Sequence, residues 1–213
     1  MPGLRPARRE DLKALAHISH KTALLGEPAR FFPSEALWGE LFVRPYLERG
    51  CCNFVAEEGG RILGYILGVC HPLGLLPYFL LRLLPLLLRI LLFAYGPPWP
   101  YLNYLLRLLL YPGPKAPHRA YPAHLHIAVD PEAQGQGLGQ KLMEAFLDCL
   151  KARGILGVQL STTRKNEAAR RLYRKMGFRL YQKRASPFWR TFVGRPLVHE
   201  VWVRELGKPL NSA

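Results

Sequence analysis

Acidic residues are scarce in this 213-residue chain. It holds 15 Asp and Glu against 30 Lys and Arg, which gives a formal net charge of +15 at pH 7. Such an excess predicts attraction to an anionic partner, whether a nucleotide, a nucleic acid or an acidic lipid. The positive charge is concentrated in residues 141–184, where 12 basic and 3 acidic side chains give +9 and leave +6 for the rest. We therefore expect the anion to bind near that segment.

Cysteine is also sparse. Cys51, Cys52, Cys70 and Cys149 form no C-x-x-C pair, and the start MPGLRPARRED is too polar for a secretory leader. We therefore expect reduced cysteines, no metal and a cytoplasmic protein. Because Cys51 and Cys52 begin an apolar run, they are interpreted as small core residues rather than as metal ligands or redox centres.

Neither disorder nor a repeat array fits the composition, which is 49% hydrophobic and 21% charged. Two independent domains would be cramped in 213 residues, so we expect a single domain over residues 1–213 with an insertion at 71–120. A membrane span is disfavoured as well. Residues 73–94 contain 12 leucines, but two arginines and two prolines interrupt them.

The rest of the chain carries strand and helix patterns in a regular order. The first part predicts a strand at 4–7, helices at 9–22 and 34–48, and a hairpin of strands 52–57 and 61–69. The last part predicts strands at 125–129, 156–161, 178–183 and 199–205, with helices at 138–153 and 167–176. This order indicates an α/β or α+β sheet with helices packed on it.

A glycine-rich turn, PEAQGQGLG over residues 131–139, joins strand 125–129 to helix 138–153. Glycines let backbone amides face outwards, and the helix adds its positive N-terminal dipole, so the turn predicts a phosphate site. A Walker P-loop does not fit, because Gln140 separates Gly139 from Lys141 and Leu142 replaces the required hydroxyl. A dinucleotide fold fits weakly, and a turn without a ligand is the remaining alternative.

Two spaced motifs resemble the GNAT superfamily of N-acetyltransferases. Val129-Asp130-Pro131 followed by Gln134-x-x-Gly137-x-Gly139 is similar to its acetyl-CoA motif. Residues 166–178 are similar to its second signature, N-x-x-A-x-x-x-Y-x-x-x-G-F. Residues 121–126 further resemble bacterial relatives of the acetyltransferase-like domain of O-GlcNAcases. The resemblance implies a mixed, mostly antiparallel twisted sheet with flanking helices, interrupted by a Leu-rich helical insertion.

By this resemblance, acetyl-CoA is the co-substrate. The residues implied to bind it lie on one strand, in the glycine-rich turn and in the second signature. They are Ile127, Ala128, Val129, Gln134, Gly135, Gln136, Gly137, Leu138, Gly139, Gln140, Asn166, Arg170 and Tyr173. Lys141, Arg164 and Lys165 are further candidates to meet its phosphates.

Acetyl transfer to an amine needs a neutral amine and an acid for the departing thiolate. Tyr173 is the candidate acid, and a core aromatic is the alternative, because apolar residues share its side of the helix. His124 and His126 share one face of a strand, so either is a candidate base or substrate contact; a histidine satisfied by its neighbours is the alternative. The O-GlcNAcase-like resemblance implies an acidic residue where this chain has Ala128.

The insertion at 71–120 admits three interpretations. Arg82 and Arg89 are seven residues apart and share a helical face, which suits an amphipathic element in a bilayer interface. A lid over the site, or a homodimer surface, would bury the same leucines against protein. Each interpretation lets the insertion shape the acceptor site.

The function predicted from these patterns is transfer of an acetyl group from acetyl-CoA to a primary amine of an unidentified acceptor. A non-catalytic CoA-binding or membrane-associated module is the first alternative. Nucleic-acid binding through the basic helices is the second and is less favoured.

Overall fold

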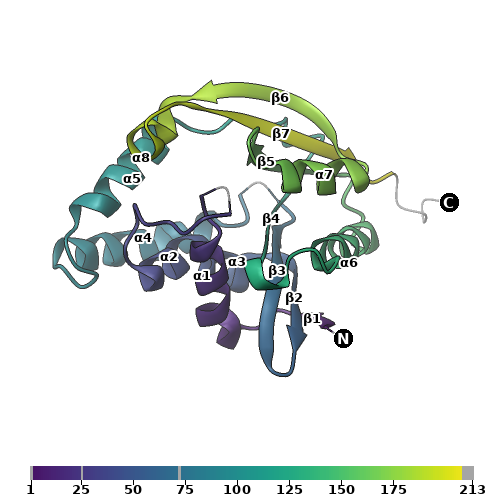
Figure 1. The fold of residues 1–213 in the computed structure, drawn as a ribbon, viewed down its shortest axis with the longest axis horizontal. Helices are drawn as coiled ribbons and strands as arrows, with labels where there is room; N and C mark the ends of the chain where they lie inside the picture. Colours follow the sequence, from purple (N-terminus) through teal and green to yellow (C-terminus); the bar gives the residue numbers. More distant parts are fainter. Residues whose placement is uncertain (1, 25, 72, 208–213) are drawn as a thin grey trace.

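The computed structural model describes residues 2–24, 26–71 and 73–207. Its strands form one seven-stranded sheet in the order β1-β2-β3-β4-β5-β7-β6 (Figure 1). Neighbouring strands are antiparallel, except that β4 and β5 are parallel. The mixed, mostly antiparallel sheet that the motifs imply is therefore confirmed. The strands are β1 (Gly3–Pro6), β2 (Cys51–Glu58), β3 (Arg61–Val69), β4 (Ala123–Val129), β5 (Gly157–Thr163), β6 (Arg179–Ser186) and β7 (Leu197–Glu205).

Helices cover both faces of the sheet (Figure 1). On one face α1 and α3 pack over β2 and β3, where Leu15 and Tyr65 are fully buried. On the other face α6 and α7 enclose a core that includes Leu142 and Phe146 of α6. The helices are α1 (Leu12–Lys21), α2 (Glu35–Phe42), α3 (Arg44–Arg49), α4 (Leu76–Leu91), α5 (Trp99–Leu110), α6 (Leu138–Ala152), α7 (Glu167–Lys175) and α8 (Arg190–Val193).

The predicted hairpin is confirmed as β2 and β3. Gly59 and Gly60 make its turn with φ of 58° and 79°, a left-handed conformation that glycine adopts without a Cβ clash. Further along β3, a Cβ on Gly68 would lie 2.7 Å from Cζ of Phe146. Glycine at position 68 therefore lets α6 approach the sheet closely.

The prediction of one continuous helix over residues 34–48 is wrong. Ser34 does cap α2, because its Oγ accepts a hydrogen bond from the backbone N–H of Leu37 at 3.2 Å. However, α2 ends and α3 begins with Pro45 in its first turn. Proline has no N–H to donate to the preceding turn, so the run of helical hydrogen bonds breaks there.

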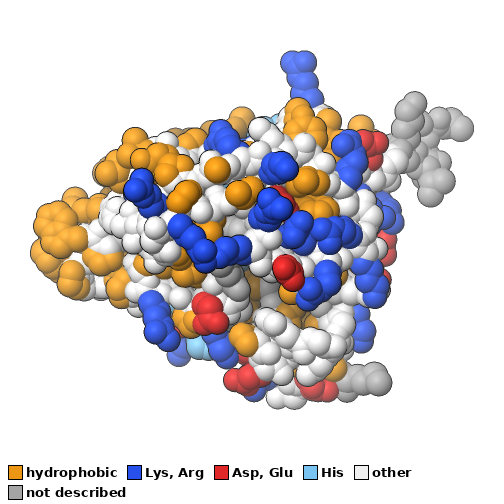
Figure 2. Space-filling view, turned by 45° about the horizontal axis from the view of Figure 1, so that its top comes forward, with side chains coloured by type: hydrophobic (Ala, Val, Ile, Leu, Met, Phe, Trp, Pro, Cys, Tyr) orange, Lys and Arg blue, Asp and Glu red, His pale blue; other side chains and the backbone are white. Residues whose placement is uncertain are grey.

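The insertion forms α4 and α5, which extend to one end of the molecule (Figure 1). Their inner faces join an aromatic cluster around Phe32, Trp38 and Tyr104. Their outer faces carry exposed apolar side chains, which gather at one end of the molecule in Figure 2. We call this set the apolar surface: Leu76, Leu80, Leu81, Leu83, Leu84, Leu88, Leu91, Leu92, Phe93, Trp99, Leu106, Leu108, Leu109 and Leu110. Within the described ranges, no helix is long and apolar enough to cross a membrane.

The expectation of reduced cysteines is wrong. Disulfides join Cys51 to Cys70 and Cys52 to Cys149. Successive strand residues normally point to opposite faces, but a β-bulge follows Cys51 and Cys52 has a φ of 55°. Both side chains consequently reach partners in the core beneath α6. Because disulfides persist mainly in oxidising environments, the cysteines no longer support a cytoplasmic location.

Residues 187–193, where the sequence patterns predicted no element, fold into a 3-10 turn and a short α-helix. A 3-10 turn (Pro187–Trp189) leads directly into α8. Ser186 caps it by accepting a hydrogen bond from the backbone N–H of Phe188 at 3.2 Å. The turn carries Phe188 and Trp189 into the aromatic cluster between the insertion and the sheet.

Candidate functional site

β4 and β5 pair at only one end. Within the described residues their parallel ladder joins Ala123 to Val158 and His124 to Gln159, and it ends there. On its other side β4 stays paired with β3 as far as Val129. The two halves of the sheet therefore open beyond His124. Backbone groups of β4 that lack a strand neighbour are available to an extended ligand.

The glycine-rich turn leads from the open end of β4 into α6. Gly135 and Gly137 have φ of 82° and 75°, so the chain turns in a conformation that other residues rarely adopt. Gly137 is the N-cap of α6 and supplies no side-chain cap, and the first turn of the helix holds no acidic residue. The first N–H groups of a 15-residue helix thus remain free to hold an anion.

A cleft of 690 Å³ lies beside this turn. The end of β4, the turn and one face of α7 form its walls. Arg171 and Lys175 supply positive charge there. By contrast, Arg170 donates from Nε to the buried Glu200 at 3.0 Å and ties α7 to β7, and Gln136 does not line the cleft.

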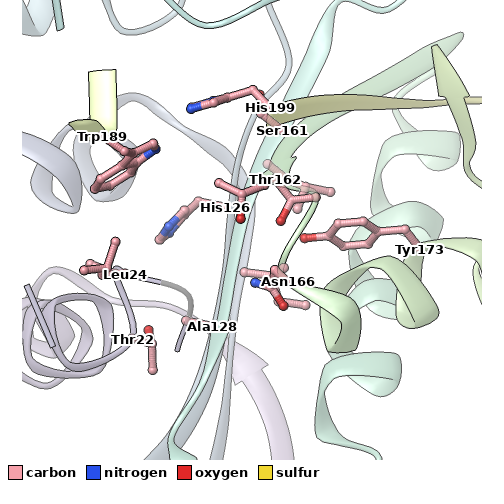
Figure 3. A pocket seen from close by; sticks show the side chains of 14 residues that line it. Thr22, Leu24, His126, Ala128, Ser161, Thr162, Asn166, Tyr173, Trp189 and His199 are labelled. Carbon is pink, nitrogen blue, oxygen red and sulfur yellow. The ribbon is translucent and has the colours of Figure 1, made fainter. Parts of the chain in front are cut away.

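A smaller cavity of 260 Å³ lies on the other side of β4. The segment after α1, strands β4 and β5, Trp189 and His199 surround it, as Figure 3 shows. Residues common to both spaces lie along the opening of the sheet. They are Thr22, Ile127, Ala128, Asn166 and Tyr173. The cleft and the cavity therefore meet between β4 and β5.

His126 projects into the smaller cavity from β4 (Figure 3). Its Nδ1 lies 3.0 Å from the hydroxyl of Tyr65, so Nε2 is left to face the cavity. Although His126 is open to solvent through the cavity, the surrounding protein desolvates the ring and lowers its pKa to about 4. The imidazole is therefore neutral at pH 7 and presents an uncharged nitrogen to whatever occupies the cavity.

Comparison with known sequences identifies this arrangement. The sequence profile of the Acetyltransferase (GNAT) family matches residues 20–178. The chain belongs to the GNAT acetyltransferase family. The matched region contains the glycine-rich turn, α7 and every residue that the cleft and the cavity share.

Two acetyltransferases match over shorter stretches, and one solved structure matches over almost the whole chain. Mycothiol acetyltransferase of Beutenbergia cavernae is 44% identical over 64 residues, which are 30% of this chain and 22% of that protein. The [ribosomal protein bS18]-alanine N-acetyltransferase of Escherichia coli is 45% identical over 53 residues, 25% of this chain and 36% of that one. The crystal structure of SsHAT is 26% identical with a TM-score of 0.67, covering 97% of this chain and 99% of that chain. The matches thus span about a fifth to a third of the two curated relatives.

The second GNAT signature brings Asn166 and Tyr173 to the opening of the sheet (Figure 3). Asn166 caps α7: its Oδ1 accepts from the backbone N–H of Ala169 at 3.1 Å, which leaves the amide nitrogen as a donor. Tyr173 is 5% exposed, and burial raises the pKa of its phenol. The hydroxyl consequently keeps its proton at any pH used for an assay.

His124 occupies a different position from His126. Its Nε2 lies 3.0 Å from the hydroxyl of Tyr46, and His124 lines neither the cleft nor the cavity. Burial also lowers the pKa of His124 to about 4. The position of His124 therefore fits the alternative interpretation, in which a neighbouring residue satisfies the histidine's hydrogen bonding.

Asp130, in the first GNAT motif, is a structural anchor that the sequence did not reveal. It is 3% exposed and accepts hydrogen bonds from Lys21 at 3.0 Å, Arg61 at 3.2 Å and the backbone N–H of Glu132 at 3.2 Å. These contacts hold the start of the glycine-rich turn against α1 and β3. Burial alone would raise the pKa of the Asp130 carboxyl, but the hydrogen bonds from Lys21, the Glu132 backbone and Arg61 lower it overall.

Three cavity residues escaped the sequence analysis. Among the described residues, four buried side-chain atoms lack a hydrogen-bond partner. Three of these atoms belong to residues that line the smaller cavity: Thr163 Oγ1, Trp189 Nε1 and His199 Nε2. An unsatisfied buried polar atom costs about 1–3 kcal/mol, so such a concentration marks a place built for a polar ligand. No local motif signals these residues, because β6 and β7 must fold before they meet the cavity.

Proposed function

We propose that this GNAT protein transfers the acetyl group of acetyl-CoA to a primary amine, acting as a single domain with residues 71–120 as an insertion. The supporting observation is that a cofactor-sized cleft and a separate small cavity meet at one opening in the sheet. A two-substrate reaction needs such a meeting point, since each substrate enters from its own side.

In this proposal the cleft holds acetyl-CoA. Amides from Gly135 to Gly139, which donate to no backbone carbonyl of a neighbouring turn in the described chain, bind the pyrophosphate at the N-terminus of α6, with Arg171 and Lys175 nearby. The pantetheine arm lies along the unpaired edge of β4 at Ile127, Ala128 and Val129. This route ends beside Asn166 and Tyr173, where the thioester would face the smaller cavity.

The chemistry needs three groups at that point. The amine nitrogen attacks the thioester carbonyl carbon, and the carbon–sulfur bond breaks. The Tyr173 hydroxyl gives its proton to the departing sulfur. It can do so because burial raises the pKa of the phenol and keeps it protonated. Nε2 of the neutral His126 receives the proton that the amine nitrogen loses. The Asn166 amide supports the carbonyl oxygen as negative charge develops there.

The names of the relatives do not identify the acceptor of this protein. Mycothiol acetyltransferase and the bS18-alanine N-acetyltransferase carry the names of different acceptors, and their similarity covers only part of each protein. The finer resemblance of residues 121–126 to bacterial relatives of the O-GlcNAcase acetyltransferase-like domain remains our proposal. It leaves His126 as the base, because Ala128 has no carboxylate.

Thiol release from acetyl-CoA across a panel of primary amines tests the function. Ala128 lines both spaces, and its side chain lies on the same face of β4 as His126, whereas pantetheine would meet only its backbone. Ala128→Leu should therefore narrow the junction from the acceptor side while leaving the pyrophosphate turn intact. We expect amine-dependent thiol release by the natural protein, and loss of turnover with retained acetyl-CoA binding in the variant. Binding of acetyl-CoA without thiol release for any amine would instead favour the non-catalytic alternative.

We further propose that the apolar surface contacts an anionic membrane. Leu84 and Leu109 are 77% and 79% exposed, and residues 71–120 contain no acidic side chain. Self-association through this surface would bring Arg82 and Arg89 of two copies together without countercharges. Anionic headgroups would supply those countercharges, and burial of each leucine in the bilayer interface favours binding.

Liposome flotation tests this contact. The natural protein should float with phosphatidylserine vesicles more than with phosphatidylcholine vesicles, and Leu84→Ser with Leu109→Ser should reduce flotation. Leu180→Ser, on the distant strand β6 and 43% exposed, is the matched control and should have no effect. Failure to float, combined with a dimer in size-exclusion chromatography, would favour the homodimer interpretation.

A further inference from the structure

The smaller cavity has walls that select against charged acceptors. Among its described lining residues there is no Asp, Glu, Lys or Arg. An amino-acid acceptor would leave its carboxylate without a cation there, and a polyamine would leave its second ammonium without an anion. The cavity therefore suits a molecule whose only ionisable group is the reacting amine.

The same walls carry hydrogen-bonding groups without protein partners. Trp189 Nε1–H only donates, whereas the Thr163 hydroxyl and a neutral His199 each donate or accept. Burial and the nearby Arg184 lower the pKa of His199, which keeps it neutral. Hydroxyl groups match this set, because a hydroxyl is both donor and acceptor.

These groups converge on one part of the cavity. Figure 3 shows the Trp189 nitrogen and the His199 ring pointing toward the same space, away from the end occupied by Ala128 and Thr22. The indole is held by edge contacts to Phe31 at 5.7 Å and Phe188 at 4.9 Å. Its position is therefore fixed before an acceptor binds. A volume of 260 Å³ limits that acceptor to a small molecule.

We infer that the acceptor is a small hydroxylated amine, of the amino-alcohol or amino-sugar class, whose hydroxyls bind Thr163, Trp189 and His199 while its amine faces Ala128. This inference rests on the proposed acetyltransferase function and names its substrate class. A site that hydrogen-bonds a substrate hydroxyl strongly rejects the analogue that lacks it, because its polar groups then stay unpaired.

Matched acceptors test the inference. Thiol release is compared for 2-amino-1,3-propanediol and isopropylamine at equal concentrations of unprotonated amine, with an alanyl peptide as a third acceptor. We expect kcat/KM for the diol to exceed that for isopropylamine by at least tenfold. Equal rates for the two amines, or a faster reaction with the peptide, would overturn the inference.

Two substitutions test which residues cause the preference for the diol over isopropylamine. Thr163→Val and Trp189→Phe keep shape but remove one hydroxyl and one N–H, so each should lower the ratio of the diol rate to the isopropylamine rate about tenfold or more. Thr191→Val, on the exposed side of α8, is the control and should retain the preference. Equal losses for both amines would reject hydroxyl recognition by these residues.

A binding measurement separates this inference from the proposed function. With non-reactive desulfo-CoA present, the diol should shift the indole N–H resonance that Trp189→Phe removes, and isopropylamine should not. A selective shift without turnover would contradict acetyl transfer yet support acceptor recognition. Turnover without a selective shift would support acetyl transfer and overturn the acceptor class.

Discussion

The double variant Cys52→Ala with Cys149→Ala should lower the free energy of unfolding by about 4.7 kcal/mol. The disulfide joins residues 97 positions apart, and closing a loop of that length removes this much chain entropy from the unfolded state. The Cys51–Cys70 bridge spans 19 positions, so its removal should cost only about 3 kcal/mol. For a chain of this size the larger loss corresponds to a decrease in Tm of roughly 9–19 °C.

Urea unfolding under oxidising and reducing conditions measures the effect. The reduced proteins provide the control, because they keep the packing change of each substitution but have no cross-link. Stability lost in the oxidised pair and not in the reduced pair therefore belongs to the disulfide. If denatured, untreated protein shows four free thiols, or if reductant leaves the unfolding midpoint unchanged, the two bridges do not exist and the reasoning fails.

Four further predictions concern the site and the residues that support it. Tyr173→Phe should lower kcat about 100-fold or more with acetyl-CoA binding unchanged, because it removes only the acid, while Tyr181→Phe on exposed β6 should match the natural enzyme; an unchanged kcat would remove Tyr173 from the mechanism. The surrounding protein lowers the pKa of His126 from its ordinary 6.5, so kcat/KM, calculated on the concentration of unprotonated amine, should show no loss centred at pH 6.5 and should fall only nearer pH 4; an acid limb at 6.5 would contradict this assignment. Since His124 is also neutral when folded, unfolding takes up protons below pH 6.5, and the free energy of unfolding should decrease as the pH falls from 6.5 toward 4. Asp130→Asn should cost about 1–3 kcal/mol, because Lys21 and Arg61 lose their buried partner, and a urea midpoint equal to that of the natural protein would disprove the anchor.

The parts of the fold that depend on local chemistry were predictable from sequence. Gly59 and Gly60 indicated a hairpin, and the glycines ahead of an amphipathic segment indicated a turn that leads into a helix. Pro45 was equally visible, yet the pattern of apolar residues around it suggested one helix where the structure has two. The periodicity of a helix persists across a break, whereas the backbone hydrogen bonds do not.

The parts that depend on distant segments were not predictable. The Cys52–Cys149 bridge requires both a bulge in β2 and the packing of α6 on the sheet. Trp189 and His199 reach the cavity only after β6 and β7 have added to β5. Arg170 lies within the second motif and was a candidate cofactor contact, but it points to Glu200, whereas Arg171, about 100° further around the helix, lies beside the cleft.

In the proposed function, acetyl-CoA and an amine react across the opening between β4 and β5. Mass spectrometry of an amine incubated with isotopically labelled acetyl-CoA and the protein tests this most directly. A labelled acetyl group should appear on the amine nitrogen with the natural protein and not with Ala128→Leu, which should still bind acetyl-CoA. An unlabelled amine in both reactions, or equal labelling in both, would contradict it.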